Sequence, residues 1–178
     1  SCLVGSEMCI RDRDADAIRN DGFTNVIPIE EIKTIDGISI YRTTGHHGFG
    51  QIGQMMGPVS GYVLKAEGFP TVYIMGDCRW EACIRDTVER FNPDYIVVNS
   101  GGAIFPEFSK TDGPIIPDEN EVMQILDELP SHIKLIAVHM DAIDHCQTTR
   151  AILRNEATHH EADMSRLIIP EDGETVVL

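Results

Sequence analysis

One arrangement recurs along the chain: a short apolar run of β-forming residues stops at a glycine or a polar side chain, and a segment with helical periodicity follows. The apolar runs cover residues 71–75, 95–98 and 133–138, and the helical patterns cover residues 80–91 and 118–129. Strands that alternate with helices favour a parallel sheet against which the helices pack. The sequence therefore predicts an α/β protein, with no internal repeat and no second domain.

The run at residues 71–75 ends at Gly76, and the next residue is Asp77. Glycine lets the backbone turn sharply where a strand leaves a sheet. Asp77 is thus expected at the carboxyl end of a strand, which is where open sheets carry their chemistry. The alternative is that Asp77 only caps the helix that begins near Trp80.

Histidines follow two other strands in the same way. His46 and His47 lie in a glycine-rich segment after the strand pattern at residues 38–42, and His139 comes directly after residues 133–138. A single histidine of this kind is more often structural or merely exposed than a ligand. Three strand ends that carry His, Asp and His together favour a site for Zn²⁺, Mn²⁺ or Fe, because these ions accept imidazole and carboxylate ligands.

Five segments, in this order, resemble the metallo-β-lactamase-fold hydrolases, and the branch they resemble most is that of the ascorbate-6-phosphate lactonase-like enzymes. The segments are RTTGHHGFG at 42–50, MGPVSGY at 56–62, YIMGD at 73–77, NSGGA at 99–103 and AVHM at 137–140. The resemblance runs from about Ala15 to the C-terminus. It implies that His47, Asp77 and His139 are metal ligands, and His47 is preferred to His46 because it directly precedes Gly48.

The first ligand cluster of that family, His-x-His-x-Asp-His, has no counterpart anywhere in these 178 residues. The resemblance therefore implies half of an αββα sandwich whose N-terminal half is missing. A complete site with two metal ions cannot be assembled from one copy of such a chain. We expect residues 14–178 to be the C-terminal portion of the domain and to be inactive alone.

In the intact enzyme, the resemblance implies two ions, Zn²⁺ or Mn²⁺ or Fe, which lower the pKa of a water molecule. The resulting hydroxide would attack an ester, lactone, phosphoester or amide in a small-molecule substrate. Asp77 would bridge the two ions, while His47 and His139 would each complete the coordination of one. His145 is a second catalytic candidate, for orienting substrate or donating a proton, although it could equally cap or pack.

Residues 1–13 show no periodicity and lie outside the resemblance, so we interpret them as a non-native or artefactual leader. The chain has 29 acidic and 14 basic residues, a formal charge of −15, which argues against nucleic acid or an anionic membrane surface as partner. No apolar run approaches the 18 or so residues that span a bilayer. A cytoplasmic protein is expected, and a homo-oligomer is an assembly that the sequence leaves open.

Two other functions stay open at this stage. The chain could be a metal-free binding or interaction module, or it could bind phosphate through the backbone of the glycine-rich segment at residues 99–103. Two further features are interpreted without any functional role. His159 and His160 are expected on a solvated helix face, and Met55 and Met56 are more often core filler than a flap over a site.

Overall fold

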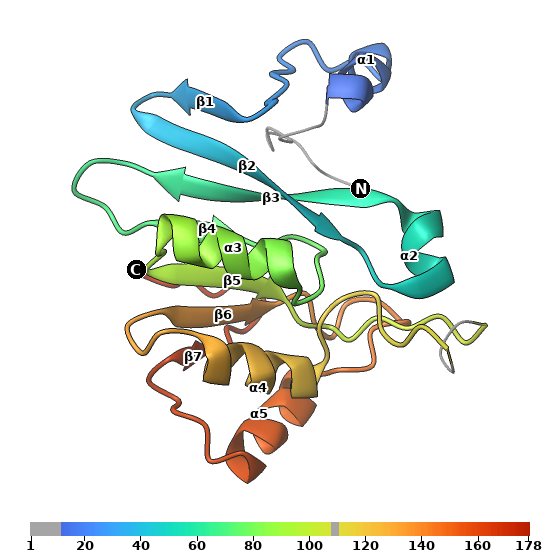
Figure 1. Ribbon diagram of the computed structural model, residues 1–178, viewed down its shortest axis with the longest axis vertical. Helices are drawn as coiled ribbons and strands as arrows, with labels where there is room; N and C mark the ends of the chain where they lie inside the picture. Colours follow the sequence, from blue (N-terminus) through green and yellow to red (C-terminus); the bar gives the residue numbers. More distant parts are fainter. Residues whose placement is uncertain (1–11, 108–110) are drawn as a thin grey trace.

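A computed structural model of the chain describes residues 12–107 and 111–178, and seven strands in these ranges form one sheet whose order follows the chain (Figure 1). The strands are β1 Ile32–Ile35, β2 Ile38–His46, β3 Pro58–Lys65, β4 Val72–Ile74, β5 Tyr95–Asn99, β6 Lys134–Val138 and β7 Leu167–Ile168. Neighbours from β1 to β4 are antiparallel, and neighbours from β4 to β7 are parallel. The predicted α/β class is confirmed, with an antiparallel region added at one side.

The helices are α1 Asp12–Asn20, α2 Gly50–Met56, α3 Ala82–Phe91, α4 Glu119–Glu128 and α5 Arg150–His159. Each of α3, α4 and α5 connects two parallel strands, and all three lie on one face of the sheet (Figure 1). Crossovers of one hand place their helices on one face, which explains this arrangement. No helix of the two described ranges is both long enough and apolar enough to cross a membrane.

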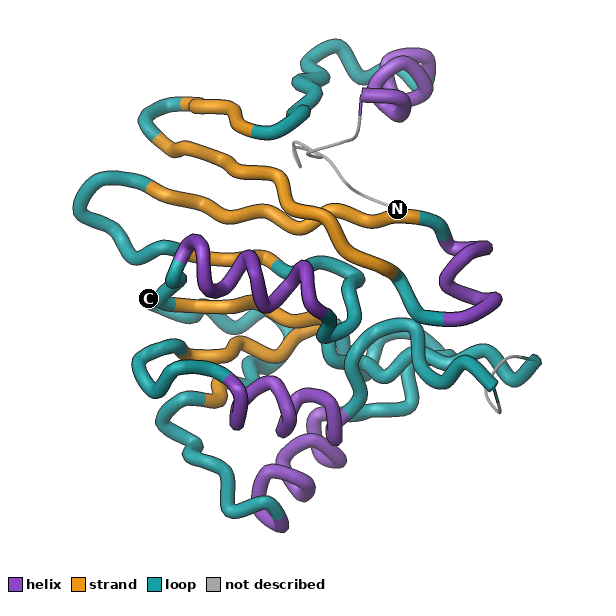
Figure 2. Tube along the Cα trace, viewed as in Figure 1, coloured by secondary structure: helices purple, strands orange, loops and turns teal. Residues whose placement is uncertain are grey.

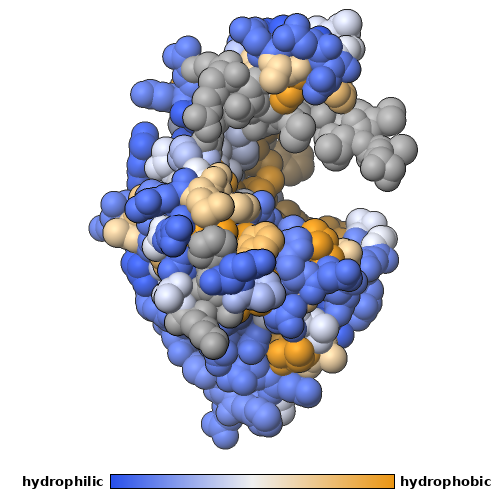
Figure 3. Space-filling view, turned by 90° about the vertical axis from the view of Figure 1, so that its right-hand side faces the viewer, coloured by the Kyte–Doolittle hydropathy of each residue, from blue (hydrophilic) through white to orange (hydrophobic). Residues whose placement is uncertain are grey.

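Two neighbouring rows of paired residues show how the two faces of the sheet differ. The row on the helix side consists of Tyr41, Val63, Tyr73, Ile96, Leu135 and Leu167, all within or packed against the main core. The next row, on the opposite face, consists of Arg42, Tyr62, Ile74, Val97, Ile136 and Ile168. Of these only Ile136 is buried, and Ile74 is 37% exposed. In Figure 3 the side turned away from the helices is hollowed, and apolar residues line the hollow.

Two expectations about particular segments need comment. Met55 and Met56 are 66% and 38% exposed, so their interpretation as core filler is wrong. The predicted boundary between residues 13 and 14 falls inside α1, which begins at Asp12, while residues 1–11 of the predicted leader lie outside the described residues.

Candidate metal centre

The loops that follow β4, β5 and β6 gather at one end of the sheet (Figure 2), and Asp77 lies at the first of them. Gly76 has φ of +71°, and a Cβ there would lie 2.8 Å from the carbonyl oxygen of Ser60, so only glycine fits. Asp77 is half-buried, and its Oδ1 accepts a hydrogen bond of 2.7 Å from Nδ2 of Asn99. The N-cap of α3 is Glu81, so the capping interpretation of Asp77 is wrong.

The two adjacent histidines lie where β2 ends. The backbone N–H of His46 donates to Oε1 of Glu81 at 2.8 Å, and its Nδ1 lies 2.8 Å from the same oxygen. The N–H of Arg79 donates to the carbonyl oxygen of His46 at 3.0 Å. These contacts fasten the segment that carries His47 to the loop that carries Asp77. The ring of His46 is therefore occupied by its contact with Glu81, while the half-buried His47 is the other histidine of the segment that could bind a metal ion.

His139 is the first residue after β6, and its backbone φ is +64°. The N–H of Ser100 donates to the carbonyl oxygen of Val138 at 2.8 Å, which pairs the ends of β5 and β6. Sγ of Cys146 lies 3.7 Å from Nδ1 of His139. A Cβ at Gly101 would meet the His139 carbonyl oxygen at 2.4 Å, so the turn packs tightly on the glycine-rich segment.

The charges of these residues act on one another. Burial lowers the pKa of His47 from its ordinary value, and the positive charges of His139 and His145 lower it further, while the negative charge of Asp77 opposes both effects. The structure therefore brings His47, Asp77, His139 and His145 within electrostatic reach. Because a metal ion binds the neutral imidazole, a lowered pKa prepares His47 for that role.

Among the side chains of residues 12–107 and 111–178, no three His, Cys, Asp or Glu residues lie close enough together to hold one metal ion. The predicted donors thus share one end of the sheet without closing around a common point. Their chemistry, two imidazoles and a carboxylate in half-buried positions, fits Zn²⁺, Mn²⁺ or Fe. The residues present fit part of such a site.

The remaining histidines have different surroundings. The ring of His145 stacks on Phe105, with ring centroids 5.3 Å apart and an angle of 18° between the planes. His159 and His160 are exposed, as predicted, and Nε2 of His160 lies 2.8 Å from Oδ2 of Asp127. His145 thus belongs to the same end of the sheet as the predicted ligands, whereas His160 belongs to the surface between α4 and α5.

Sequence analysis missed a buried ion pair that supports the Asp77 loop. Nε of Arg79 donates to Oε2 of Glu121 at 2.5 Å, and the N–H of Trp80 donates to Oε1 at 2.7 Å. Burial raises the pKa of Glu121, although the charge of Arg79 counteracts the rise. The Arg79 guanidinium also lies 4.9 Å from the centroid of the Phe49 ring. The detectable signal was an acid directly beside Val122 on the apolar side of the helical pattern.

Backbone N–H groups of the glycine-rich segment after β5 donate hydrogen bonds to other parts of the protein. The N–H of Ser100 donates to Val138, and the N–H of Gly102 donates to the carbonyl oxygen of Pro117 at 2.9 Å. A phosphate site of the expected kind needs such N–H groups to point at the ligand. The segment instead places Asn99 against Asp77, which counts against the phosphate-binding alternative.

A pocket of about 580 Å³ opens beside His46. Its walls include Phe49, Gln54, Pro58 and Glu81, with several glycines of the segment around α2. His46 and Gly48, the neighbours of His47 in the chain, line this pocket, and it offers apolar surface beside the Glu81 carboxylate.

No protein-family model matches the chain. A curated relative, the UPF0173 protein YddR of Bacillus subtilis (strain 168), is 31% identical over 166 residues, which are 92% of this chain and 63% of the relative. Two solved structures are similar to a comparable degree. A possible metal-dependent hydrolase from Veillonella parvula DSM 2008 is 31% identical with a TM-score of 0.85, over 93% of this chain and 64% of its own. An isothiocyanate hydrolase from Delia radicum gut bacteria is 33% identical with a TM-score of 0.84, over 94% and 65%.

A more distantly related solved structure is named as a metallo-beta-lactamase fold protein. The metallo-beta-lactamase fold protein YhfI of Bacillus subtilis is 14% identical, with a TM-score of 0.59 over 90% of this chain and 60% of its own. The expected likeness to metallo-β-lactamase-fold proteins is therefore confirmed at the level of the fold. The chain spans 63 to 65% of the length of the relatives that are above 30% identical.

Proposed function

We propose that the chain is part of a metal-dependent hydrolase and supplies His47, Asp77 and His139 to its metal centre. The observation that carries the proposal is geometric: His47, Asp77 and His139 follow β2, β4 and β6 at one end of the sheet, and a hydrogen bond from Asn99 orients Asp77 there. Two similar proteins are named as hydrolases, which supports the reaction class. We further propose that the other ligands lie in a part of the protein outside these 178 residues, and that this chain is inactive alone.

The metal pair would supply a hydroxide nucleophile at neutral pH. Asp77 would bring the negative charge that two cations share, and the hydrogen bond from Asn99 holds one of its oxygens in a fixed direction. His47 and His139 would bring neutral imidazoles from the two sides. His145, kept in place by Phe105, would bind the substrate or deliver a proton to the leaving group.

The substrate class we propose is a small molecule with an electrophilic carbon or phosphorus: an ester, lactone, amide or phosphoester. The isothiocyanate hydrolase among the similar structures adds isothiocyanates, whose central carbon lies between nitrogen and sulfur. The pocket beside His46 has apolar walls that suit the side chain of such a molecule. We also propose a cytoplasmic location, possible homo-oligomers, and neither nucleic acid nor membrane as partner.

The experiment compares Asp77→Asn with His160→Ala in the protein at its full natural length. Asn keeps the shape of Asp77 but removes the charge, so metal content and hydrolysis of a panel of esters, lactones, phosphoesters, amides and isothiocyanates should both fall to background. The side chain of His160 contacts the surface residue Asp127, away from the predicted ligands, so its variant should keep both. Equal behaviour of the two variants would refute the site assignment, and retained metal with lost activity would refute Asp77 as a ligand.

A further inference from the structure

The turn that carries His139 has an unfavourable backbone. His139 and Asp141 have φ of +64° and +61°, in the left-handed region that residues with a Cβ rarely adopt. Two such residues within three positions persist only where surrounding contacts hold them. The geometry of His139 therefore depends on whatever holds this turn.

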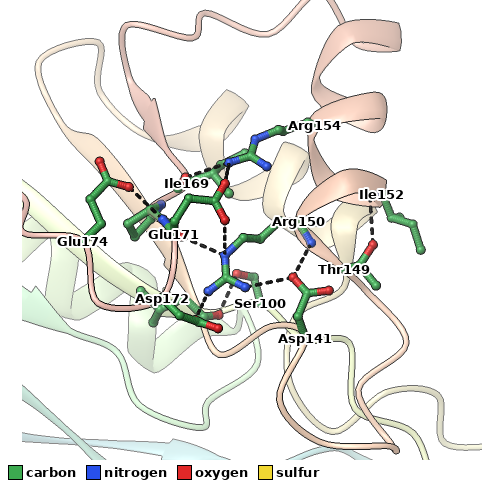
Figure 4. Close-up of polar contacts among 12 residues, drawn as sticks. Ser100, Asp141, Thr149, Arg150, Ile152, Arg154, Ile169, Glu171, Asp172 and Glu174 are labelled. Atoms are coloured by element: carbon green, nitrogen blue, oxygen red, sulfur yellow. Dashed lines mark hydrogen bonds and ion pairs between the residues drawn. The ribbon is translucent and has the colours of Figure 1, made fainter.

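Arg150, at the start of α5, makes the contacts that hold Asp141 (Figure 4). Its backbone N–H donates to Oδ2 of Asp141 at 3.1 Å, and its Nη1 donates to the same oxygen at 2.9 Å. Nε donates to the carbonyl oxygen of Pro170 at 2.7 Å, and Nη2 donates to Oδ1 of Asp172. The Arg150 side chain is only 11% exposed. A charged group buried to this extent is fixed by its partners, so it can act as a rigid anchor.

We propose that Arg150 is a positioning residue: through Asp141 it locks the turn after β6 and so keeps His139 in the orientation that binds metal. The consequence for metal binding rests on the proposed function, whereas the hydrogen bonds between Arg150 and Asp141 do not depend on it. Nδ1 of His139 faces Sγ of Cys146 at 3.7 Å, so Nε2 would be the ligating nitrogen. Groups that hydrogen-bond directly to a metal ligand usually contribute a factor of about 10 to 100 to metal affinity. Asp141 acts one step further away, through the backbone of the turn, so we expect an effect at the lower end of that range.

The same region provides matched controls. Arg154, one turn further along α5, also holds the C-terminal segment: its Nη2 donates to Oε1 of Glu171 at 2.7 Å and to the carbonyl oxygen of Ile169 at 3.2 Å. These contacts do not include Asp141. Asp172 is a second control, because it accepts from the same guanidinium as Asp141 but belongs to the C-terminal segment.

The experiment uses two pairs of variants, Arg150→Ala against Arg154→Ala and Asp141→Asn against Asp172→Asn. The second pair guards against misfolding, since both carboxylates are exposed and Asn tolerates the left-handed backbone as well as Asp does. For each protein the imidazole ¹H–¹⁵N correlations of His139 are recorded without metal, and zinc affinity is measured by competition with a chelator. His139→Gln identifies the signals.

We expect Arg150→Ala and Asp141→Asn to shift or broaden the His139 signals and to weaken zinc binding by about 10-fold or more. Arg154→Ala and Asp172→Asn should leave the signals in place and change the zinc affinity by less than about 2-fold. Unchanged His139 signals in Asp141→Asn would overturn the proposal, and so would equal effects of Asp141→Asn and Asp172→Asn. If the signals move as expected while even the unaltered protein binds no zinc, the positioning role stands and the proposed metal function fails.

Discussion

Strands β5 and β6 differ from the edge strand β1 in how well the helices cover them. On the helix side, Ile96 in β5 and Leu135 in β6 are completely buried, whereas Ile32 in β1, which pairs with Tyr41 of the same row, is 52% exposed. Strands β5 and β6 are parallel and are connected by a helix, while β1 forms the antiparallel edge of the sheet (Figure 1). One sheet thus joins a well-packed region to a loosely covered one.

The predicted ligands come from both regions. His139 follows β6 in the parallel region, His47 follows β2 in the antiparallel region, and Asp77 follows β4, where the two regions meet. Tertiary contacts hold His139 from behind, through Arg150 and Asp141. His47 depends on the contacts of its neighbour His46 with Arg79 and Glu81. We therefore expect Asp77 and His139 to be held in position more firmly than His47.

Truncation of one buried and one exposed side chain tests the contrast in packing. Leu135→Ala removes a fully buried side chain and should lower the free energy of unfolding by about 2–5 kcal/mol. Ile32→Ala removes a side chain that is 52% exposed and should cost less than about 1 kcal/mol. Urea titrations followed by circular dichroism measure both. Similar costs for the two variants would mean that the regions do not differ in the way described.

Removal of polar partners tests which side of the site matters more. Asn99→Ala deletes the donor to Asp77, and zinc affinity should fall by about 10-fold or more, because Asp77 loses its fixed orientation. His46→Ala removes the exposed side-chain contact with Glu81 but keeps both backbone hydrogen bonds of residue 46, so it should change the affinity by less than about 2-fold. Chelator competition gives both values. A larger loss in the His46 variant would reverse the proposed order of the two sides.

The pH dependence of stability should show a smaller effect of His47. Folding lowers its pKa below the ordinary value of 6.5, mainly through burial, so the unfolded chain takes up the proton more readily. The contribution to stability is therefore complete above pH 6.5 and declines as the pH falls through 6.5 toward the lowered value. The variant His47→Gln should lose this part of the decline between pH 7 and pH 5. Identical pH profiles for the two proteins would contradict the shift.

Local sequence patterns predicted much of the fold. The β-branched composition of residues 95–98 and the helical spacing of residues 80–91 correspond to β5 and α3, within two residues of their observed ends. Each pattern reflects packing against the nearest part of the core, which the sequence records directly. The exposure of Met55 and Met56 was not predictable, because it depends on what covers α2 in three dimensions.

The site was predictable in part for the same reason. Asp77 and His139 follow strand patterns directly, so their places at the end of the sheet could be inferred from the chain. The support given to them by Asn99, Glu121 and Arg150 could not, because each partner lies more than nine residues away or on another element. Long-range hydrogen bonds leave no periodic signal.

The most direct test of the metal site is the anomalous scattering of zinc in crystals of the chain soaked with Zn²⁺. Tetrahedral zinc lies about 2.0–2.2 Å from histidine nitrogen and carboxylate oxygen ligands. We predict a peak at that distance from the Asp77 carboxylate and from Nε2 of His139, with His47 approaching from the other side of Asp77. A strong peak at His160 and Asp127 with none between Asp77 and His139, at saturating zinc, would contradict the assignment of the metal centre.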